Sequence, residues 1–380
     1  MSQAKVLIIS HTAELGGAER VLLRFLEQQE GFEARLLCPK GPLSIWAQKA
    51  GIPTGLARGL GKLNREKNPL WPLVFCWRLV RSLFEITGQI VREKPDLIQA
   101  NGFGTMLYAS LPALLTRRPL VWHMHDIKTG VFGRLTSAFF DLFASHIVAV
   151  SNAVAQNLIA QGIDPEKIRV IHNHVQPDHL IQGNGQVTAQ LEALKADGSR
   201  LVGMMGSIEE RKGMIEAVEA LSLIKDHPVK LVLAGGVHSP SQAGYRAKLE
   251  ALVAAEGLEE KVILLGQVEE AAEFYLGIDL FLHYPKYPDP LPTVLLEAMA
   301  LGRPVLANQL GGNAECLGQG KWGRLVAPGR LDILAKELHQ PRQPLDGYAK
   351  VQFLDHFSLK TQQTEFALVY DHLLEEHVLD

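Results

Sequence analysis

Short apolar runs, rich in β-branched residues, alternate with longer amphipathic stretches along the whole chain. Several of the short runs are apolar throughout, a pattern typical of strands buried on both faces of a parallel sheet. The predicted strands of the first half are Lys5–Ser10, Ala34–Pro39, Asp96–Ala100, Leu120–Asp126, Ile147–Ser151 and Ile168–Asn173. Those of the second half are Leu201–Gly206, Lys230–Gly235, Lys261–Gly266, Asp279–His283, Pro304–Ala307 and Arg324–Val326. Helical stretches separate the strands, so the pattern predicts βαβ units in a doubly wound α/β fold.

The alternation is interrupted once, between residues 176 and 200. The residues there that break regular structure are Pro177, Gly183, Asn184, Gly185, Asp197 and Gly198. We therefore predict two similar α/β domains, residues 1–177 and 201–357, joined by a linker, 178–200. A tail with a helical pattern, 358–380, follows the last predicted strand. Ligands of such sheets bind where the strands end, so the residues just after the strands are the candidates for function.

Composition excludes several classes of protein. The 380 residues are 47% apolar and 21% charged, which is ordinary for a protein with a buried core. No run approaches the about 20 apolar residues of a membrane-spanning helix, and Val6–Ile9 is too short for the core of a signal peptide. Three widely spaced cysteines argue against a disulfide framework, and a net charge of −3 gives no sign of nucleic-acid binding. We expect a cytoplasmic protein.

The segment Asp289–Val305 carries the clearest motif. It follows a predicted strand, turns through a proline-rich loop and begins a helix near Thr293, which Gly302 ends. The start of this helix, at Pro292, Thr293 and Val294, suits a phosphate, because the backbone N–H groups of Thr293 and Val294 are free there. Glu297, about one turn into the helix, is placed to accept hydrogen bonds from a ribose diol, and Asp289 from the hydroxyls of a second sugar. The alternative is an ordinary helix with solvated acids.

This segment closely resembles the Glu-(seven residues)-Glu element of retaining GT-B glycosyltransferases, the family-four group in particular. The resemblance continues in Gly311–Glu315, which is similar to the group's Gly-Gly-x-x-Glu loop. The first acid departs from the pattern, because Asp289 stands where the group has Glu.

A second element of the group lies after the first strand of the second half. The segment Gly203–Gly213 resembles the signature in which an Arg and a Lys hold the donor diphosphate. Lys212 matches the Lys, while Ser207 occupies the usual position of the Arg, and Arg211 is the nearest substitute. Two cations would neutralise a pyrophosphate and the charge that builds on the leaving group. The alternative is a solvated turn.

The loop after the first strand contains Gly16 and Gly17, which let backbone N–H groups approach an anion closely. The pair does not fit Gly-x-Gly-x-x-Gly, which argues against a nicotinamide site. It resembles the group's first-loop Gly-Gly-Ala-Glu signature, which lies near the donor phosphate and the acceptor.

Two histidines, His123 and His125, end a predicted strand on one face. A zinc site is one interpretation, but no third ligand has supporting spacing. A satisfied structural histidine is another. The resemblance implies that His125 is the group's histidine that contacts the donor sugar and the reaction centre, with Asp126 orienting it. Asn173 resembles the Asn of the group's Asn-Gly element, and we expect it to be structural.

The stretch Arg58–Lys94 differs in character from the rest of the chain. Its basic residues are Arg58, Lys62, Arg65, Lys67, Arg78, Arg81, Arg92 and Lys94, against Glu66, Glu85 and Glu93. Its aromatic residues are Trp71, Phe75, Trp77 and Phe84. This mixture suits a weak contact with an anionic membrane surface, at the inner face of the membrane. The alternative is a helix packed in the core, with Trp77 and Phe84 buried.

The resemblance covers nearly the whole chain and implies a GT-B protein, with two Rossmann-like domains facing across a cleft and a tail that packs back on the first domain. It implies a retaining glycosyltransferase that moves a hexose-type sugar from a nucleotide sugar, UDP in preference to GDP, to a glycan, lipid or small-molecule acceptor. The chain contains no Asp-x-Asp, the pair through which GT-A transferases hold a metal. We therefore expect no metal and no cofactor. The alternatives are a nucleotide-sugar epimerase, a phosphorylase or sucrose-type synthase, and a non-catalytic nucleotide-sugar binder.

Overall fold

The computed structural model describes residues 3–62, 70–177 and 185–379. The chain divides into two compact units. Unit 1 consists of Met1–His174 together with Leu359–Asp380, and unit 2 is Val175–Ser358. Each unit is built on one parallel β-sheet, which confirms the predicted α/β class.

The sheet of unit 1 has the strand order β3-β2-β1-β4-β5-β6-β7, and all its neighbours are parallel. Its strands are β1 (Lys5–Ser10), β2 (Glu33–Cys38), β3 (Thr54–Leu56), β4 (Leu97–Asn101), β5 (Leu120–Met124), β6 (His146–Ala149) and β7 (Ile168–Val170). The three-residue β3 was not predicted, because Gly51, Pro53 and Gly55 in this stretch are typical of a turn. β5 and β7 end earlier than predicted, which places His125 and Asn173 in loops.

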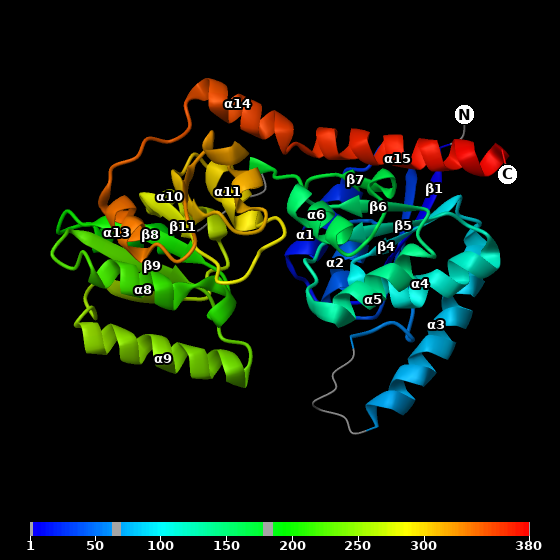
Figure 1. The fold of residues 1–380 in the computed structure, drawn as a ribbon, viewed down its shortest axis with the longest axis horizontal. Coiled ribbons are helices and arrows are strands. Elements are labelled where there is room, and N and C mark those ends of the chain that lie inside the picture. Colours follow the sequence, from blue (N-terminus) through cyan, green and yellow to red (C-terminus); the bar gives the residue numbers. More distant parts are fainter. Residues whose placement is uncertain (1–2, 63–69, 178–184, 380) are drawn as a thin grey trace. The chain divides into compact units, whose positions relative to one another are not determined.

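Helices cover both faces of this sheet (Figure 1). They are α1 (Gly17–Glu27), α2 (Pro42–Lys49), α3 (Trp71–Glu93), α4 (Phe103–Thr116), α5 (Gly130–Asp141), α6 (Asn152–Ala160) and the C-terminal α15 (Leu359–Leu379), with a short 3₁₀ turn, η2 (Pro165–Lys167). Neighbouring residues of β5 show the two faces. Val121 belongs to a core shared with α1, α2 and α15, whereas the ring of Trp122 packs against Phe103 of α4 and Phe140 of α5.

The tail of the chain completes the core of unit 1. Phe366 and Tyr370 of α15 are buried with strand residues such as Ile8 and Val121. The Tyr370 hydroxyl also donates a hydrogen bond to the side chain of Gln99 on β4. Residues from opposite ends of the chain therefore form one hydrophobic layer.

The sheet of unit 2 has the order β10-β9-β8-β11-β12-β13 and is also parallel. Its strands are β8 (Arg200–Met205), β9 (Val229–Ala234), β10 (Val262–Gly266), β11 (Leu280–His283), β12 (Val305–Asn308) and β13 (Arg324–Val326). Its helices are α7 (Gln186–Leu194), α8 (Met214–Ser222), α9 (Pro240–Glu256), α10 (Ala271–Gly277), α11 (Thr293–Ala300), α12 (Asn313–Cys316), α13 (Leu331–His339) and α14 (Gly347–His356), with 3₁₀ turns η4 (Glu210–Lys212) and η5 (Gly318–Gly320).

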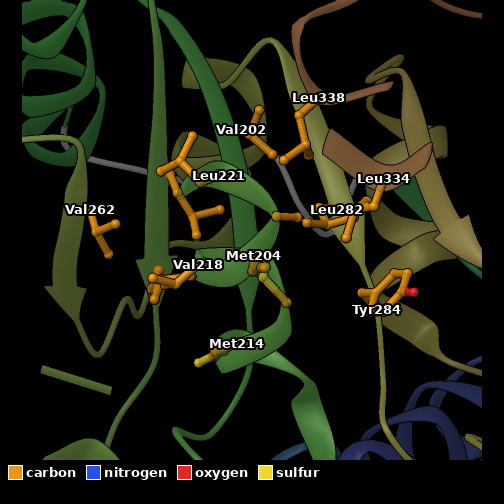
Figure 2. Close-up of a cluster of buried hydrophobic side chains, with 14 of the residues drawn as sticks. Val202, Met204, Met214, Val218, Leu221, Val262, Leu282, Tyr284, Leu334 and Leu338 are labelled. Carbon is orange, nitrogen blue, oxygen red and sulfur yellow. The ribbon is translucent and has the colours of Figure 1, made fainter. Parts of the chain in front are cut away.

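The core of unit 2 lies between the sheet and helices α8, α9 and α13. Figure 2 shows Val202 and Met204 of β8 and Leu282 of β11 beside Val218 of α8 and Leu334 of α13. These side chains are at most 3% exposed. The sheet, and with it the loops that follow β8 and β11, therefore rests on a tightly buried apolar layer.

The predicted linker, 178–200, is not a plain connection. Residues 178–184, which include Gly183 and Asn184, lie outside the described residues, but the rest of the segment contains α7 and belongs to unit 2. The start of α7 is capped from a distance, because the buried Glu273 carboxylate accepts hydrogen bonds from the N–H groups of Gly185, Val187 and Thr188. Gly185, one of the glycines that predicted a linker, is thus the N-cap of a helix that α10 stabilises.

Within the described residues, no helix is both long and apolar enough to cross a membrane. Cys38, Cys76 and Cys316 are free thiols.

Candidate functional site

The polar residues predicted in unit 2 follow the two central strands of its sheet. The strand order reverses between β8 and β11, and such a switch point is where open α/β sheets bind ligands. The loop after β8 carries Arg211 and Lys212 in η4, and the loop after β11 carries Asp289. The fold therefore brings together residues 77 and 78 positions apart in the sequence.

Lys212 is held close to the end of β11 by the glycine that follows it. Gly213 has φ +70°, and a Cβ there would lie 1.8 Å from the carbonyl oxygen of Tyr284. Only glycine allows this approach. The Lys212 side chain is 13% exposed, and burial lowers the pKa of its ammonium group, an effect that Asp289 partly opposes.

Asp289 is the centre of a charged cluster. Its Oδ2 lies 3.4 Å from Arg211 Nη1, 3.7 Å from Lys212 Nζ and 3.9 Å from Nε2 of His283, the last residue of β11. Burial lowers the pKa of His283 to about 3, so this ring is neutral at pH 7. Two cations therefore lie beside one carboxylate, and of the three groups Lys212 and Asp289 are largely withdrawn from solvent.

The loop that begins with Gly311 fixes the backbone of Asp289. Gly312 N–H donates to the Asp289 carbonyl oxygen at 2.8 Å. Cβ atoms on Gly311 and Gly312 would lie 2.3 Å from the carbonyl oxygen of Asp289 and 2.1 Å from that of Pro290. Gly311 also has φ +60°. The two motifs recognised in the sequence are thus one packed unit, in which the glycines let two loops touch.

Helix α11 lies next along the chain. It begins at Thr293, as predicted, with Pro292 as its N-cap, and Gly302 has the expected left-handed conformation, with φ +73°. Glu297 is half-buried, and its Oε2 accepts a hydrogen bond of 3.0 Å from the hydroxyl of the buried Tyr275. Burial and the Glu297 carboxylate keep the pKa of Tyr275 well above its ordinary value, so the hydroxyl remains a donor.

Arg211 also borders a hollow of about 440 Å³, whose lining includes Glu209, Gln242, Tyr245 and Lys248. Arg211 donates to Glu209 at 3.1 Å, so its guanidinium is shared between two carboxylates. The cationic cluster therefore has open space beside it.

The glycine pair of unit 1 begins α1, as predicted. Gly16 is the N-cap, and its N–H donates to Oε2 of Glu19 at 3.0 Å. Burial raises the pKa of the Glu19 carboxyl. Because the Gly16 amide is already bonded, an anion at this loop would depend on the amides that follow it.

His125 lies directly after β5 in unit 1. Its Nε2 is 2.8 Å from Oδ1 of Asn101, the last residue of β4, so the ring is oriented by Asn101 and not by the predicted Asp126, which pairs with Lys128. Burial lowers the pKa of His125 to about 4, so the ring is neutral, with the proton on Nε2. Its buried Nδ1 has no hydrogen-bond partner in the described part of the chain and is a ready acceptor.

His123 has a different environment. It is 5% exposed, lies 4.0 Å from the His125 ring and packs edge-on against Phe366, with Nδ1 3.4 Å from the side chain of Gln99. The two rings share one side, as the alternation predicted. Across the described residues, no group of three His, Cys, Asp or Glu side chains is placed to hold a metal. Asn173 is buried, and its structural role stays a prediction.

Sequence reasoning missed Tyr275, His283 and Asn101. His283 and Asn101 are the last residues of their strands, so the rule that ligands bind at strand ends contained a signal for them. Tyr275 lies in α10 within a buried aromatic pair, and nothing in its local sequence distinguishes it from a core residue.

Comparison with known proteins identifies both halves of the chain. Residues 15–179 match the family described as Glycosyltransferase Family 4, and residues 188–340 match the family described as Glycosyl transferases group 1. Among curated proteins, an uncharacterized glycosyltransferase of Methanocaldococcus jannaschii is 25% identical over 64% of this chain and 65% of its own length. The Escherichia coli protein named UDP-Gal:alpha-D-GlcNAc-diphosphoundecaprenol alpha-1,3-galactosyltransferase is 23% identical over 83% of this chain and 82% of its own length.

Solved structures share the fold. The Anabaena protein HepE, in complex with UDP and glucose, has a TM-score of 0.80 at 22% identity, over 97% of this chain and 99% of that one. Sucrose-phosphate synthase of Thermosynechococcus elongatus has a TM-score of 0.76 at 18% identity, over 98% of this chain and all of the other. These likenesses confirm a fold of two Rossmann-like domains of the GT-B type. With both halves matched by glycosyltransferase families in the order expected, the chain belongs to the family-four group of GT-B glycosyltransferases.

Proposed function

We propose that the chain transfers a hexose-type sugar from a nucleotide sugar, UDP in preference to GDP, to a glycan, lipid-linked or small-molecule acceptor. The observation that carries the proposal is the cluster in unit 2, where Arg211 and Lys212 lie within 4 Å of Asp289 at the switch point of the sheet. A diphosphate matches this cluster in charge, and its position is the one where nucleotides bind to such sheets.

The cations act on the leaving group. When the bond between C1 of the sugar and the phosphate oxygen breaks, negative charge grows on the diphosphate. Lys212 and Arg211 are already in place, and a desolvated environment strengthens their attraction for that charge. Fixed cations supply the electrostatic stabilisation that a metal ion supplies elsewhere, so we propose that the reaction needs no added metal.

The acids bind hydroxyl groups. Glu297, oriented by the Tyr275 hydroxyl, is proposed to accept hydrogen bonds from the ribose, and Asp289 from the donor sugar. Before the donor binds, Arg211 and Lys212 hold the Asp289 carboxylate in place. The bound diphosphate then competes with this carboxylate for the same two cations. The start of α11, at Pro292, Thr293 and Val294, is proposed to hold a phosphate.

The two elements of unit 1 keep the roles that the resemblance implies. Gly16 and Gly17 are proposed to lie near the donor phosphate. His125 is proposed to contact the donor sugar, and its buried, unpartnered Nδ1 supports the role, since it can accept a hydrogen bond from a hydroxyl.

We propose that the anomeric configuration is retained. Double displacement would require a carboxylate on the far face of the sugar, and no side chain has been assigned to that place. In the front-face alternative, the acceptor oxygen bonds to C1 on the face that the phosphate leaves, and the acceptor's proton passes to a phosphate oxygen. NMR of the first-formed product tests this step, and inversion would contradict it.

The names of similar proteins support the choice of substrates. The Escherichia coli relative is named for a UDP-galactose donor and a diphosphoundecaprenol acceptor, and Anabaena HepE was solved with UDP-glucose. We therefore favour UDP-sugars and a glycan or lipid-linked acceptor.

The test is incubation of the purified protein with labelled UDP- and GDP-sugars, with and without EDTA. Slow release of free nucleotide and sugar supports a transferase. A changed nucleotide sugar would indicate an epimerase, and binding without turnover a non-catalytic binder. Loss of all turnover in EDTA, restored by added divalent metal, would contradict the metal-independent mechanism.

A further inference from the structure

Unit 1 carries an extended apolar surface on helices α3, α4 and α5, which contact one another in that order (Figure 1). The large apolar side chains exposed there are Leu70, Leu73, Trp77, Val80, Phe84, Val91, Leu107, Leu111, Leu114, Leu115, Val131, Phe132, Leu135, Phe139 and Leu142. We name them the α3–α5 surface. Exposed apolar side chains that gather on neighbouring helices in this way mark a candidate interaction site.

The surface is most pronounced at α5. Its inner face is buried through Gly133, Ser137 and Phe140. On the outer face, Val131 is 76% exposed, Phe132 71% and Leu135 65%, and Leu142, just after the helix, is 78% exposed. The helix therefore has an apolar side toward the sheet and a second apolar side toward solvent.

Helix α4 repeats this arrangement. It contains no charged residue, and it exposes Leu107, Leu111, Leu114 and Leu115 along one side. In α3, Trp77 is 52% and Phe84 72% exposed, which contradicts the interpretation that both are buried in the core.

The exposed charged residues on these helices and their loops are all basic. Between residues 70 and 142, the exposed charged residues are Arg92, Lys94, Arg117 and Arg134, and every acid is at least partly buried. Four of the acids are engaged in ion pairs: Glu85 with Arg81, Glu93 with Arg35 and Arg92, Asp126 with Lys128 and Asp141 with Lys167. These helices and their loops therefore present apolar side chains together with an excess of positive charge.

We infer that the α3–α5 surface docks unit 1 on a lipid bilayer that contains anionic headgroups. Amphipathic helices with exposed aromatic and aliphatic residues and flanking cations lie in such interfaces, with the apolar face among the acyl chains. The surface extends beyond Arg58–Lys94 and includes α4 and α5; Arg65 and Lys67 lie outside the described residues and are not needed for it. A second copy of the chain fits less well, because two such surfaces would bring Arg and Lys groups of like sign together.

The test is co-sedimentation with vesicles of phosphatidylcholine, with and without phosphatidylglycerol, at low and high salt and without any sugar donor. We expect the protein to bind phosphatidylglycerol vesicles at low salt at least tenfold more tightly than phosphatidylcholine vesicles, and high salt to reduce the difference, since charges are screened within about 10 Å. The Phe132→Ser/Leu135→Ser variant should lose at least tenfold in vesicle affinity. A protein that does not sediment at low salt overturns the inference.

A matched control comes from unit 2. Tyr348 and Val351 of α14 are 74% and 65% exposed, so Tyr348→Ser/Val351→Ser removes similar apolar groups elsewhere and should leave vesicle binding unchanged. If Phe132→Ser/Leu135→Ser lowers the thermal unfolding midpoint, Leu111→Ser/Leu115→Ser on α4 replaces it. Equal loss in the unit 1 and unit 2 variants contradicts the inference. The inference is also contradicted if the protein does not bind vesicles and light scattering shows a dimer that the α5 variant no longer forms. The assay uses no donor, so its outcome is separate from that of the proposed transfer.

Discussion

The two units share one architecture but present different surfaces and different chemistry. Each has a parallel sheet buried under helices on both faces, and in each the polar loops follow the central strands. In unit 1 the outer helices α3–α5 expose many large apolar side chains. In the described part of unit 2 the exposed ones are Leu223, Leu276, Tyr287, Tyr348 and Val351, which are scattered over several elements. A buried sheet therefore leaves the outer faces of its helices free to acquire separate roles.

The loops at the strand ends differ as well. Unit 2 gathers charged groups, Arg211, Lys212 and Asp289, around one point. Unit 1 gathers the neutral histidines His11, His123 and His125, whose pKa values are lowered by burial. A cluster with two cations suits an anionic ligand and neutral imidazoles suit hydroxyl groups, so this difference agrees with a donor diphosphate in unit 2. Four predictions test the comparison, from the largest expected effect to the smallest.

Acid should destabilise unit 1 before unit 2. The pKa values of His11 and His125 are lowered to about 4, so between pH 6.5 and 4 the unfolded chain binds protons that the folded chain does not. Each buried histidine then removes up to about 1.4 kcal/mol of stability per pH unit as the pH falls. Unit 2 contains one comparable group among its described residues, His283. Hydrogen exchange between pH 7 and 4.5, resolved by peptide, measures the order; earlier loss of protection in unit 2 would break the comparison.

Lys212→Ala should abolish most transfer while leaving vesicle binding intact. Removing one preorganised donor to a developing negative charge typically costs about 10²–10³ in kcat. Lys336→Ala on α13, an exposed lysine of the same unit, is the control and should keep wild-type activity. Turnover of Lys212→Ala within a factor of two of the wild type would remove the leaving-group role.

Gly311→Ala should destabilise unit 2 by roughly 2–3 kcal/mol and reduce transfer, since a Cβ would clash with the backbone of Asp289 as well as strain φ. Gly329→Ala separates the two causes. Gly329 has φ +75°, and a Cβ there would meet no atom within 4 Å, so only strain of about 1–2 kcal/mol is expected. Thermal unfolding of both variants gives the difference; equal losses would show that the contact with Asp289 is unimportant.

Asp289→Asn should slow transfer about tenfold while raising UDP affinity a few-fold, because the carboxylate that competes with the diphosphate for Arg211 and Lys212 is removed. Glu297→Ala should instead weaken UDP binding about tenfold, through loss of hydrogen bonds to the ribose. Calorimetric titration with UDP, together with kcat and KM, distinguishes them. The assignment fails if both variants lose UDP affinity equally.

Much of the site in unit 2 was predictable because its signals are local. A proline-rich turn, a helix that starts near Thr293 and a stop at Gly302 are decided by residues next to one another, and the structure has all three. The partners of the site residues were not predictable. Tyr275 holds Glu297 from 22 positions upstream, and Asn101 holds His125 from the neighbouring strand. The pattern of residues along the chain contains no information on which polar side chains, distant in sequence, form hydrogen bonds with one another.

The linker shows the same limit. Gly185 and Gly198 correctly mark breaks in regular structure, but the helix between them depends on Glu273 and on the packing of Leu191 against Gly277. Both contacts come from α10, more than 80 positions later. The local sequence therefore predicted a break, because it contains no sign of the tertiary contacts that stabilise the helix.

The sequence by itself determined the order of strands and helices, the two-domain α/β class and the positions of Lys212, Asp289 and Glu297, because hydrophobic periodicity and turn residues act over short stretches of chain. The tertiary structure alone decided which apolar residues are buried. Helix α4 has no charged residue and reads as a core helix along its whole length, yet Leu111, Leu114 and Leu115 are exposed. Burial depends on what packs against each face, and among the described residues of this unit no further layer covers Leu111, Leu114 and Leu115.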